Sequence, residues 1–157
     1  MVAPGTFRGV HGSFQENGTI LLPDDFITAL NEMGELDLAI TPGCYHACLS
    51  VYSFSDWQKM EHRAASLPQF DQHVQDFQLT YMAPMQRCTV LHGGRIVVPE
   101  ELREVMTDGE GSIAIVGAGK FFEIWSGASW RRASSEARAR LLGELPPSLR
   151  AIVDERV

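Results

Sequence analysis

An internal repeat governs how this chain can fold. GTILLPDDF at residues 18–26 is echoed by GRIVVPEEL at residues 94–102, a shift of 94 − 18 = 76 residues. Farther along, LSVYSFSDW at 49–57 is similar to FEIWSGASW at 122–130. Each copy has the pattern of a glycine turn, an alternating strand, a proline-started short helix and two more strands. The repeat therefore predicts two similar structural units.

The turn and periodicity signals predict the individual elements. Asn-Gly at residues 17–18 is a strong hairpin signal, and Ser53 followed by Asp56 favours a helix start. Strands are expected in a hairpin over 7–22 and at 35–41, 48–54, 86–91, 95–98, 111–117 and 120–125. Helices are expected at 53–66, 70–83, 99–106, from Ser126 or Ser129 to Gly143, and at 148–155. In the 70–83 helix, the apolar face is predicted to carry Phe70, Val74, Phe77 and Tyr81.

These elements divide the chain into a first repeat (7–53), a helical linker (54–84), a second repeat (85–128) and a C-terminal helical tail (129–157). Two lobes of about 50 residues are marginal on their own, so pairing and oligomerisation are expected. Trp57 and Trp130, at equivalent places in the copies, are expected to anchor the core. The apolar stripe of Leu149, Ile152 and Val153 is expected to pack on the body or on a neighbouring subunit.

The charge is unevenly distributed along the chain. The net charge is −7, and residues 1–58 hold one basic residue, Arg8, against seven acidic ones, a balance of −6. A lobe with this balance repels phosphate, so contacts with nucleic acid are expected from the second half. The chain lacks a long apolar run and a secretory leader pattern, and its three cysteines fit no disulfide framework. We therefore expect a soluble, cytoplasmic protein with reduced thiols.

The second copy, GRIVVP preceded by CTVLHG, resembles the pattern Asp-x-x-Gly-Arg-[Ile/Leu]-x-[Ile/Val]-Pro of the MraZ family. These are bacterial transcription regulators with two tandem SpoVT/AbrB-like domains in one chain. The resemblance covers about residues 7–130 and includes VGAGKFFEIW at 116–125. It implies an α+β, mainly β fold, in which two tandem AbrB-like swapped-hairpin half-barrels pair into a pseudo-symmetric barrel with a helical linker and C-terminal helices.

The resemblance also implies a ring-shaped homo-oligomer that represses the division and cell-wall gene cluster by binding repeated upstream sites. The candidate DNA-binding residues that correspond by position to the family's loops are Arg95, Gly94, Gly93, His92, Asn17, Gly18 and Thr19. Arg87, a basic residue of the second copy, is a further candidate. Two positions depart from the family pattern. The family's aspartate is Gln15 in one copy and Leu91 in the other, and its arginine is Thr19 in the first copy.

Several residues have two interpretations. Arg95 could bind guanine or phosphate, or it could pair with Glu100 or Glu101. Gly93 and Gly94 could admit a phosphate close to the backbone or simply form a turn with positive φ.

Cys44, His46 and Cys48 have ligand-like spacing, but zinc needs a fourth ligand, so reduced thiols on a surface loop are favoured. GAGK at 117–120 lacks the Walker spacing and predicts a tight β-turn. The titratable residues form no motif for acid–base or nucleophilic catalysis.

The sequence thus predicts a non-enzymatic, MraZ-like, sequence-specific DNA-binding repressor without a cofactor. Its expected partners are double-stranded DNA and further copies of itself, with no membrane and no small-molecule substrate, and its expected location is the nucleoid. The alternative is a degenerate family member that acts as an oligomerising protein-interaction module with little DNA binding. The acidic first lobe and the changed loop residues motivate this alternative.

Overall fold

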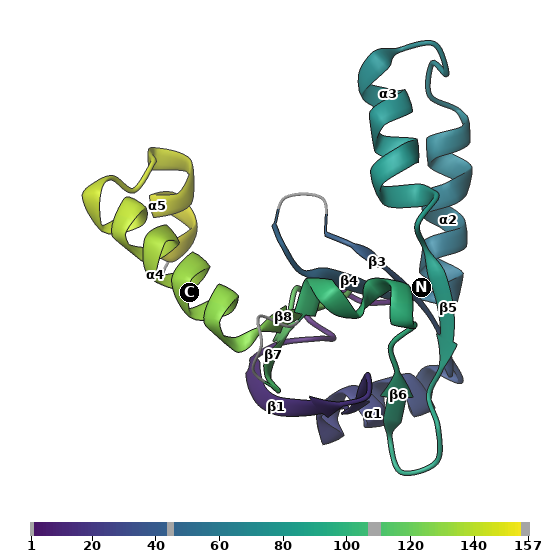
Figure 1. Cartoon of the computed structure of the whole chain (residues 1–157). Coiled ribbons are helices and arrows are strands. Elements are labelled where there is room, and N and C mark those ends of the chain that lie inside the picture. Colours follow the sequence, from purple (N-terminus) through teal and green to yellow (C-terminus); the bar gives the residue numbers. More distant parts are fainter. Residues whose placement is uncertain (1, 44–45, 107–110, 155–157) are drawn as a thin grey trace.

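The computed structural model describes residues 2–43, 46–106 and 111–154, and its centre is an eight-stranded antiparallel sheet (Figure 1). The strands are β1 (Val10–Glu16), β2 (Thr19–Leu21), β3 (Asp37–Pro42), β4 (Leu49–Ser53), β5 (Gln86–Thr89), β6 (Arg95–Val97), β7 (Ser112–Gly117) and β8 (Phe122–Ser126). The helices are α1 (Asp24–Met33), α2 (Phe54–Ala65), α3 (Gln72–Phe77), the π-helical turn η1 (Gln78–Met82), the 3-10 helix η2 (Glu100–Met106), α4 (Gly127–Gly143) and α5 (Pro147–Val153).

The two repeats exchange strands. The strand order is β5-β3-β4-β8-β7-β1-β2-β6, so β1 of the first repeat pairs with β7 of the second, and β5 of the second pairs with β3 of the first. A bridge between Leu91 and Arg95 joins the chain after β5 to β6, which brings the two ends of the sheet together. The fold is therefore the expected α+β, mainly β, swapped-hairpin barrel, and neither repeat completes its sheet without the other.

The barrel interior is filled by apolar side chains from both repeats. Phe7, Phe26 and Phe122 meet with ring centroids 5.0 to 5.2 Å apart. Ile20 and Ile96 occupy equivalent places in the two copies, pair directly across β2 and β6, and are fully buried. Each such large side chain contributes about 1.5–3 kcal/mol by its burial. The interleaved core thus makes the two repeats one folding unit.

The first hairpin turns at Asn17 and Gly18, as the Asn-Gly signal predicts. Both residues have positive φ, 53° and 79°, which a type I′ turn requires. The Gln15 side chain accepts a hydrogen bond from the Gly18 N–H at 3.0 Å. Glutamine therefore orders this turn at the position where the family pattern has aspartate.

Two helical arms leave the barrel (Figure 1). The first arm is α2 with α3 and η1, and the second is α4 with α5. α2 follows β4 and α4 follows β8, and Ser53 and Ser126 cap them by accepting hydrogen bonds from the N–H groups of Asp56 and Ser129. The predicted helix starts are thus confirmed, and the arms occupy equivalent places in the two repeats.

The tryptophans at the arm bases differ in burial. Trp57 is fully buried, with Tyr81 of η1 at a ring-centroid distance of 5.8 Å. Trp130 is half-buried and packs edge-on against Trp125 at 5.5 Å. The expected anchoring role is therefore complete in the first arm and partial in the second.

One local prediction was wrong. Phe70 does not share the face of Val74 and Tyr81, because it lies in the turn before α3 and is 97% exposed. The helix expected at 99–106 is present as a 3-10 helix over residues 100–106, and its first turn is closed by an i to i+3 bond from the Leu102 N–H to the Pro99 carbonyl. Ile152 and Val153 of α5 are each 70% exposed, so this apolar stripe does not pack on the body of its own chain, and its contact with a neighbouring subunit stays a prediction.

Candidate nucleic-acid interface

The strand pair β2–β6 lies at the centre of the candidate interface. Its register pairs Thr19 with Val97, Ile20 with Ile96, and Leu21 with Arg95. Thr19 and Arg95 are equivalent in the two repeats, so the register places a pseudo-two-fold axis through the Ile20–Ile96 pair. The isoleucines point into the barrel, and the alternation of a strand turns their neighbours outward. The outward face consists of Thr19, Leu21, Arg95 and Val97.

Arg95 projects from this face without a carboxylate partner in the described part of the chain. The alternative pairing with Glu100 or Glu101 is not observed there. A Cβ atom added to Gly93 would lie 3.1 Å from Arg95 Nη1, which places the guanidinium beside the exposed Gly93. The guanidinium donors of Arg95 thus remain available to a ligand.

Arg95 lines a shallow hollow of about 450 Å³ together with residues of the first repeat. The other lining residues are Phe14, Gln15, Glu16, Asn17, Thr19 and Leu21. The strand exchange creates this arrangement, because β6 of the second repeat lies beside β2 of the first. The hollow therefore brings together Arg95 and two of the three first-loop candidates, Asn17 and Thr19.

The turn glycines Gly18 and Gly94 are buried, and each faces a helix of the other repeat. A Cβ at Gly94 would come within 2.0 Å of Ile27 Cδ1, and a Cβ at Gly18 within 2.3 Å of Arg103 Nε. Residues 27 and 103 are themselves equivalent in the repeat. These two glycines therefore have a packing role, whereas Gly93 and the neighbouring His92 are exposed at the loop tip.

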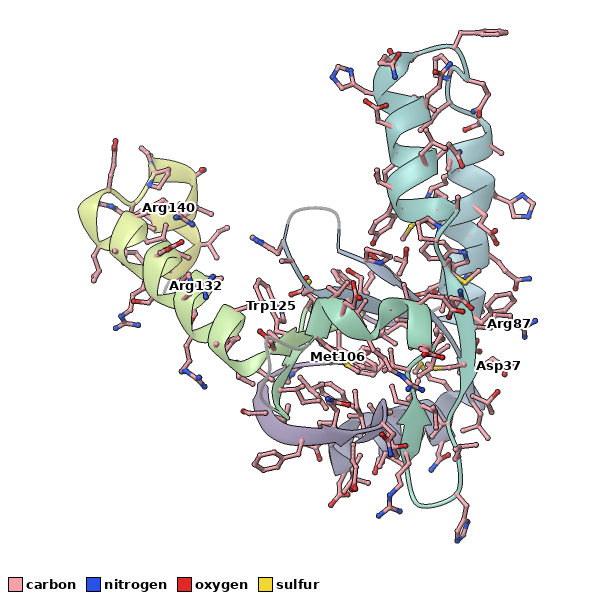
Figure 2. The ribbon with its side chains drawn as sticks, in the orientation of Figure 1. Asp37, Arg87, Met106, Trp125, Arg132 and Arg140 are labelled. Carbon is pink, nitrogen blue, oxygen red and sulfur yellow. The ribbon has the colours of Figure 1, made fainter. Side chains whose placement is uncertain are left out.

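Arg87 lies outside the hollow, on β5. Its Nη2 donates to Asp37 Oδ2 at 3.2 Å, and its guanidinium carbon lies 3.9 Å from the ring centroid of Phe54 (Figure 2). Thr89 also donates to Asp37, at 3.1 Å. Intramolecular partners thus engage Arg87, in contrast to Arg95.

Apolar side chains surround Arg95, which sequence reasoning did not foresee. In its outward row across the strands, Phe14, Leu21 and Leu91 are 75%, 48% and 49% exposed. The alternation of each strand could have indicated their direction, but not that the exchange of strands aligns them beside one arginine. The face therefore offers both a hydrogen-bonding cation and apolar contact area.

The cysteine and histidine cluster near Trp125 is only partly described, because Cys44 lies outside the described residues. Cys48 Sγ donates to Glu123 Oε2 at 3.5 Å, and the His46 ring lies 5.2 Å from the Trp125 ring. Burial raises the pKa of the Cys48 thiol well above its usual value, and the Glu123 carboxylate raises it further. Within residues 2–43, 46–106 and 111–154, no three potential ligands gather as a metal site would require.

The GAGK segment lies in the short connection that reverses the chain between β7 and β8, where a tight turn is predicted. The Ala118 N–H donates to the Phe121 carbonyl at 2.9 Å, and Gly119 has a φ of 91°. Gly119 also exchanges two backbone hydrogen bonds with Phe7, so the turn is tied to the N-terminal segment.

No helix in the described part of the chain is both long and apolar enough to cross a membrane.

The exchanged strands, the equivalent turns and the two arms define the class of this protein: a tandem AbrB-like barrel whose paired loops form one outward face. A family model described as "MraZ protein, putative antitoxin-like" matches residues 83–142. A Transcriptional regulator MraZ from Aromatoleum aromaticum is 33% identical over 108 residues, which cover 68% of this chain and 72% of the relative.

Two further relatives with that name extend over almost the whole chain. The one from Coxiella burnetii (strain Dugway 5J108-111) is 28% identical and the one from Methylococcus capsulatus 27% identical, each over 151 residues that cover 93% of this chain and 98% of the relative. The chain belongs to the MraZ family of transcriptional regulators, which is not a class of enzymes.

Proposed function

We propose that this regulator binds DNA in a sequence-specific manner with the outward face of β2–β6. The observation that carries the proposal is Arg95, which projects from the place where loops of both repeats meet and has no carboxylate partner among the described residues. A two-stranded β-ribbon fits the major groove, where arginine bonds guanine O6 and N7. In this arrangement Leu21 and Val97 would contact thymine methyl groups beside the guanine.

The remaining candidates take supporting roles at the ends of the strand pair. His92, the backbone of Gly93 and the side chain of Asn17 are exposed and would contact phosphates or base edges, and Thr19 would donate its hydroxyl. Gly18 and Gly94 would set the loop shape, and Arg87 would contribute only after leaving Asp37. In this proposal the two repeats, 7–53 and 85–128, contact DNA, and the helical segments 54–84 and 129–157 mediate assembly of the oligomer.

A single arginine on the proposed face of each chain gives weak affinity for DNA, so the proposal includes a ring of several copies. Repeated faces on tandem sites about one helical turn apart, roughly 34 Å, gain affinity through avidity. The pseudo-symmetric arms support such assembly. Residues 54–85 hold four carboxylates and two Lys or Arg residues, whereas residues 127–154 hold five arginines and three carboxylates.

The α4–α5 arm of one copy would therefore attract the α2–α3 arm of the next, and Arg132 and Arg140 line this basic arm (Figure 2). Head-to-tail contacts of this kind close into a ring when the rotation between copies permits. Bound upstream of the division and cell-wall gene cluster, the ring would repress transcription and localise to the nucleoid.

A gel-shift titration against the DNA upstream of the chain's own gene tests this function. The wild type is expected to form a specific complex at low salt, and Arg95→Gln to weaken it about tenfold or more, because one good bidentate pair contributes about 1–3 kcal/mol. Lys120→Gln is the charge-matched control, because the end of β7 next to Lys120 pairs with Val10, at the other end of β1 from the Asn17–Gly18 turn. An Arg95→Gln protein that binds as tightly as Lys120→Gln would refute the proposal.

A protein-interaction module is the second candidate function. The exposed row of Phe14, Leu21 and Leu91 favours it, because aromatic and apolar side chains around an arginine are common at the centres of protein interfaces. This function predicts a stable oligomer in light scattering but no salt-dependent DNA binding. A salt-dependent specific complex in the gel shift would exclude it as the main role.

A further inference from the structure

A cleft beyond the other end of β1 from the Asn17–Gly18 turn carries a grouping of cations. It has a volume of about 470 Å³, within the usual range for small-molecule sites. Its walls come from the N-terminal segment, from α2 between Asp56 and Arg63, and from the GAGK turn between β7 and β8. The strand exchange thus assembles it from both repeats, so its residues are scattered along the sequence and form no local motif for a small-molecule partner.

Three cations line this cleft: Lys59 and Arg63 on α2, and Lys120 in the turn. Lys59 Nζ lies 4.0 Å from Asp56, the one carboxylate in the lining, so that pair is nearly neutral. Arg63 and Lys120 form no ion pair within the described residues. The cleft therefore carries an excess of about two positive charges on a chain whose net charge is −7.

Two aromatic rings line the cleft. Phe121 stacks on Tyr52 with ring centroids 4.7 Å apart and an angle of 15° between the planes, and both rings line the cleft with Met60. The two rings cover each other's facing sides, so the pair offers a further aromatic ring contact at its edges and at its outer side. Two backbone bonds between Phe7 and Gly119 hold the turn that carries Phe121.

We propose that this cleft binds a small planar aromatic anion, such as an aromatic carboxylate. Its ring lies along Tyr52 and Phe121, and its acidic group accepts charge-assisted hydrogen bonds from Arg63 and Lys120. The site is independent of the DNA-binding proposal, because none of its residues lies on the outward face of β2–β6. An occupant would bridge α2, which follows the first repeat, and the β7–β8 turn of the second.

The test is an NMR titration of the full-length protein with 2-naphthoate, followed at the backbone amides of Gly119 and Lys120. Saturable shifts are expected with a Kd on the order of 1 mM, as ligand efficiencies for a molecule of this size indicate. The uncharged analogue 2-naphthamide keeps the ring but lacks the anion, and it is expected to bind at least about fivefold more weakly.

Two variants and a matched control complete the test. Arg63→Gln and Lys120→Gln are each expected to weaken 2-naphthoate binding about three- to tenfold. Arg95→Gln removes one charge from the outward face of β2–β6 and is expected to leave 2-naphthoate binding unchanged. The proposal is overturned if 2-naphthoate gives no saturable shifts, if 2-naphthamide binds equally well, or if neither cleft variant changes the Kd. None of these measurements contains DNA, so failure here is distinct from failure of the DNA-binding proposal.

Discussion

Gly94→Ala is expected to destabilise the barrel by more than the usual penalty for losing a turn glycine. Gly94 has a φ of 78°, and an added Cβ would lie 2.0 Å from Ile27 Cδ1 and 2.8 Å from Ile27 Cγ1. The left-handed backbone costs an alanine about 1–2 kcal/mol. Displacing Ile27, which packs against the core, adds about 1–3 kcal/mol. The free energy of unfolding should therefore fall by about 2–5 kcal/mol.

Gly93→Ala is the matched control. Gly93 has a similar φ of 84°, but an added Cβ there would meet only Arg95 Nη1, at 3.1 Å, and that flexible side chain can move. This variant should lose only the backbone term of about 1–2 kcal/mol. The difference between the two alanine variants isolates the contact between the turn of one repeat and α1 of the other.

Urea unfolding followed by tryptophan fluorescence measures both values, because Trp57 and Trp125 are 0% and 3% exposed in the folded chain. In an Ile27→Ala background the Gly94→Ala cost should shrink toward that of Gly93→Ala, since the overlapping atoms are gone. Equal losses for Gly93→Ala and Gly94→Ala in the wild-type background would refute the packing role assigned to Gly94.

Three further outcomes are expected. Thr19→Arg restores the family's arginine at the position that the pseudo-two-fold axis relates to Arg95. Anisotropy titrations should therefore show tighter DNA binding and a log–log salt slope steeper by about 0.9; an unchanged slope would count against contact between this face and phosphate. Ser53→Ala removes the cap of α2 and should cost about 1 kcal/mol in urea unfolding, and a loss near zero would contradict the cap's contribution.

Burial and the Asp37 carboxylate raise the pKa of Cys88 from 9.0 to about 12, and burial also raises that of Cys48. Both thiols should therefore resist iodoacetamide at pH 8 until urea is added, as mass mapping would show. The stability associated with neutral Cys88 is complete below pH 9 and is lost as the pH rises toward 12. Rapid labelling of either cysteine in the folded protein would contradict this burial.

Many secondary-structure elements of the fold could be predicted from the internal repeat. Asn17 and Gly18 specify a type I′ turn through local chemistry alone, and Ser53 caps α2 with a hydrogen bond to the nearby Asp56 N–H, so a pattern in a few residues was sufficient. The exchange of strands followed from family resemblance and not from local chemistry. β1 pairs with β7 about 100 residues away, as Val10 and Val116 show.

The errors arose where long-range packing decides the outcome. Phe70 fits a helical apolar pattern, but the turn after Pro68 leaves it in solvent. The roles of Gly18 and Gly94 as packing contacts depend on Arg103 and Ile27, which reach them only after the repeats interleave. The cationic cleft has the same origin, because Arg63 and Lys120 are distant in sequence. Spacing along one strand or helix contains no information about such contacts.

The central claim, that Arg95 reads guanine in the major groove, is tested most directly by DNA in which guanine is replaced with 7-deazaguanine. This base lacks the N7 acceptor but keeps normal pairing. Wild-type affinity for the substituted upstream DNA should fall about tenfold or more, whereas Arg95→Gln should bind the natural and substituted DNA equally. Equal affinity of the wild type for both DNAs would contradict the account.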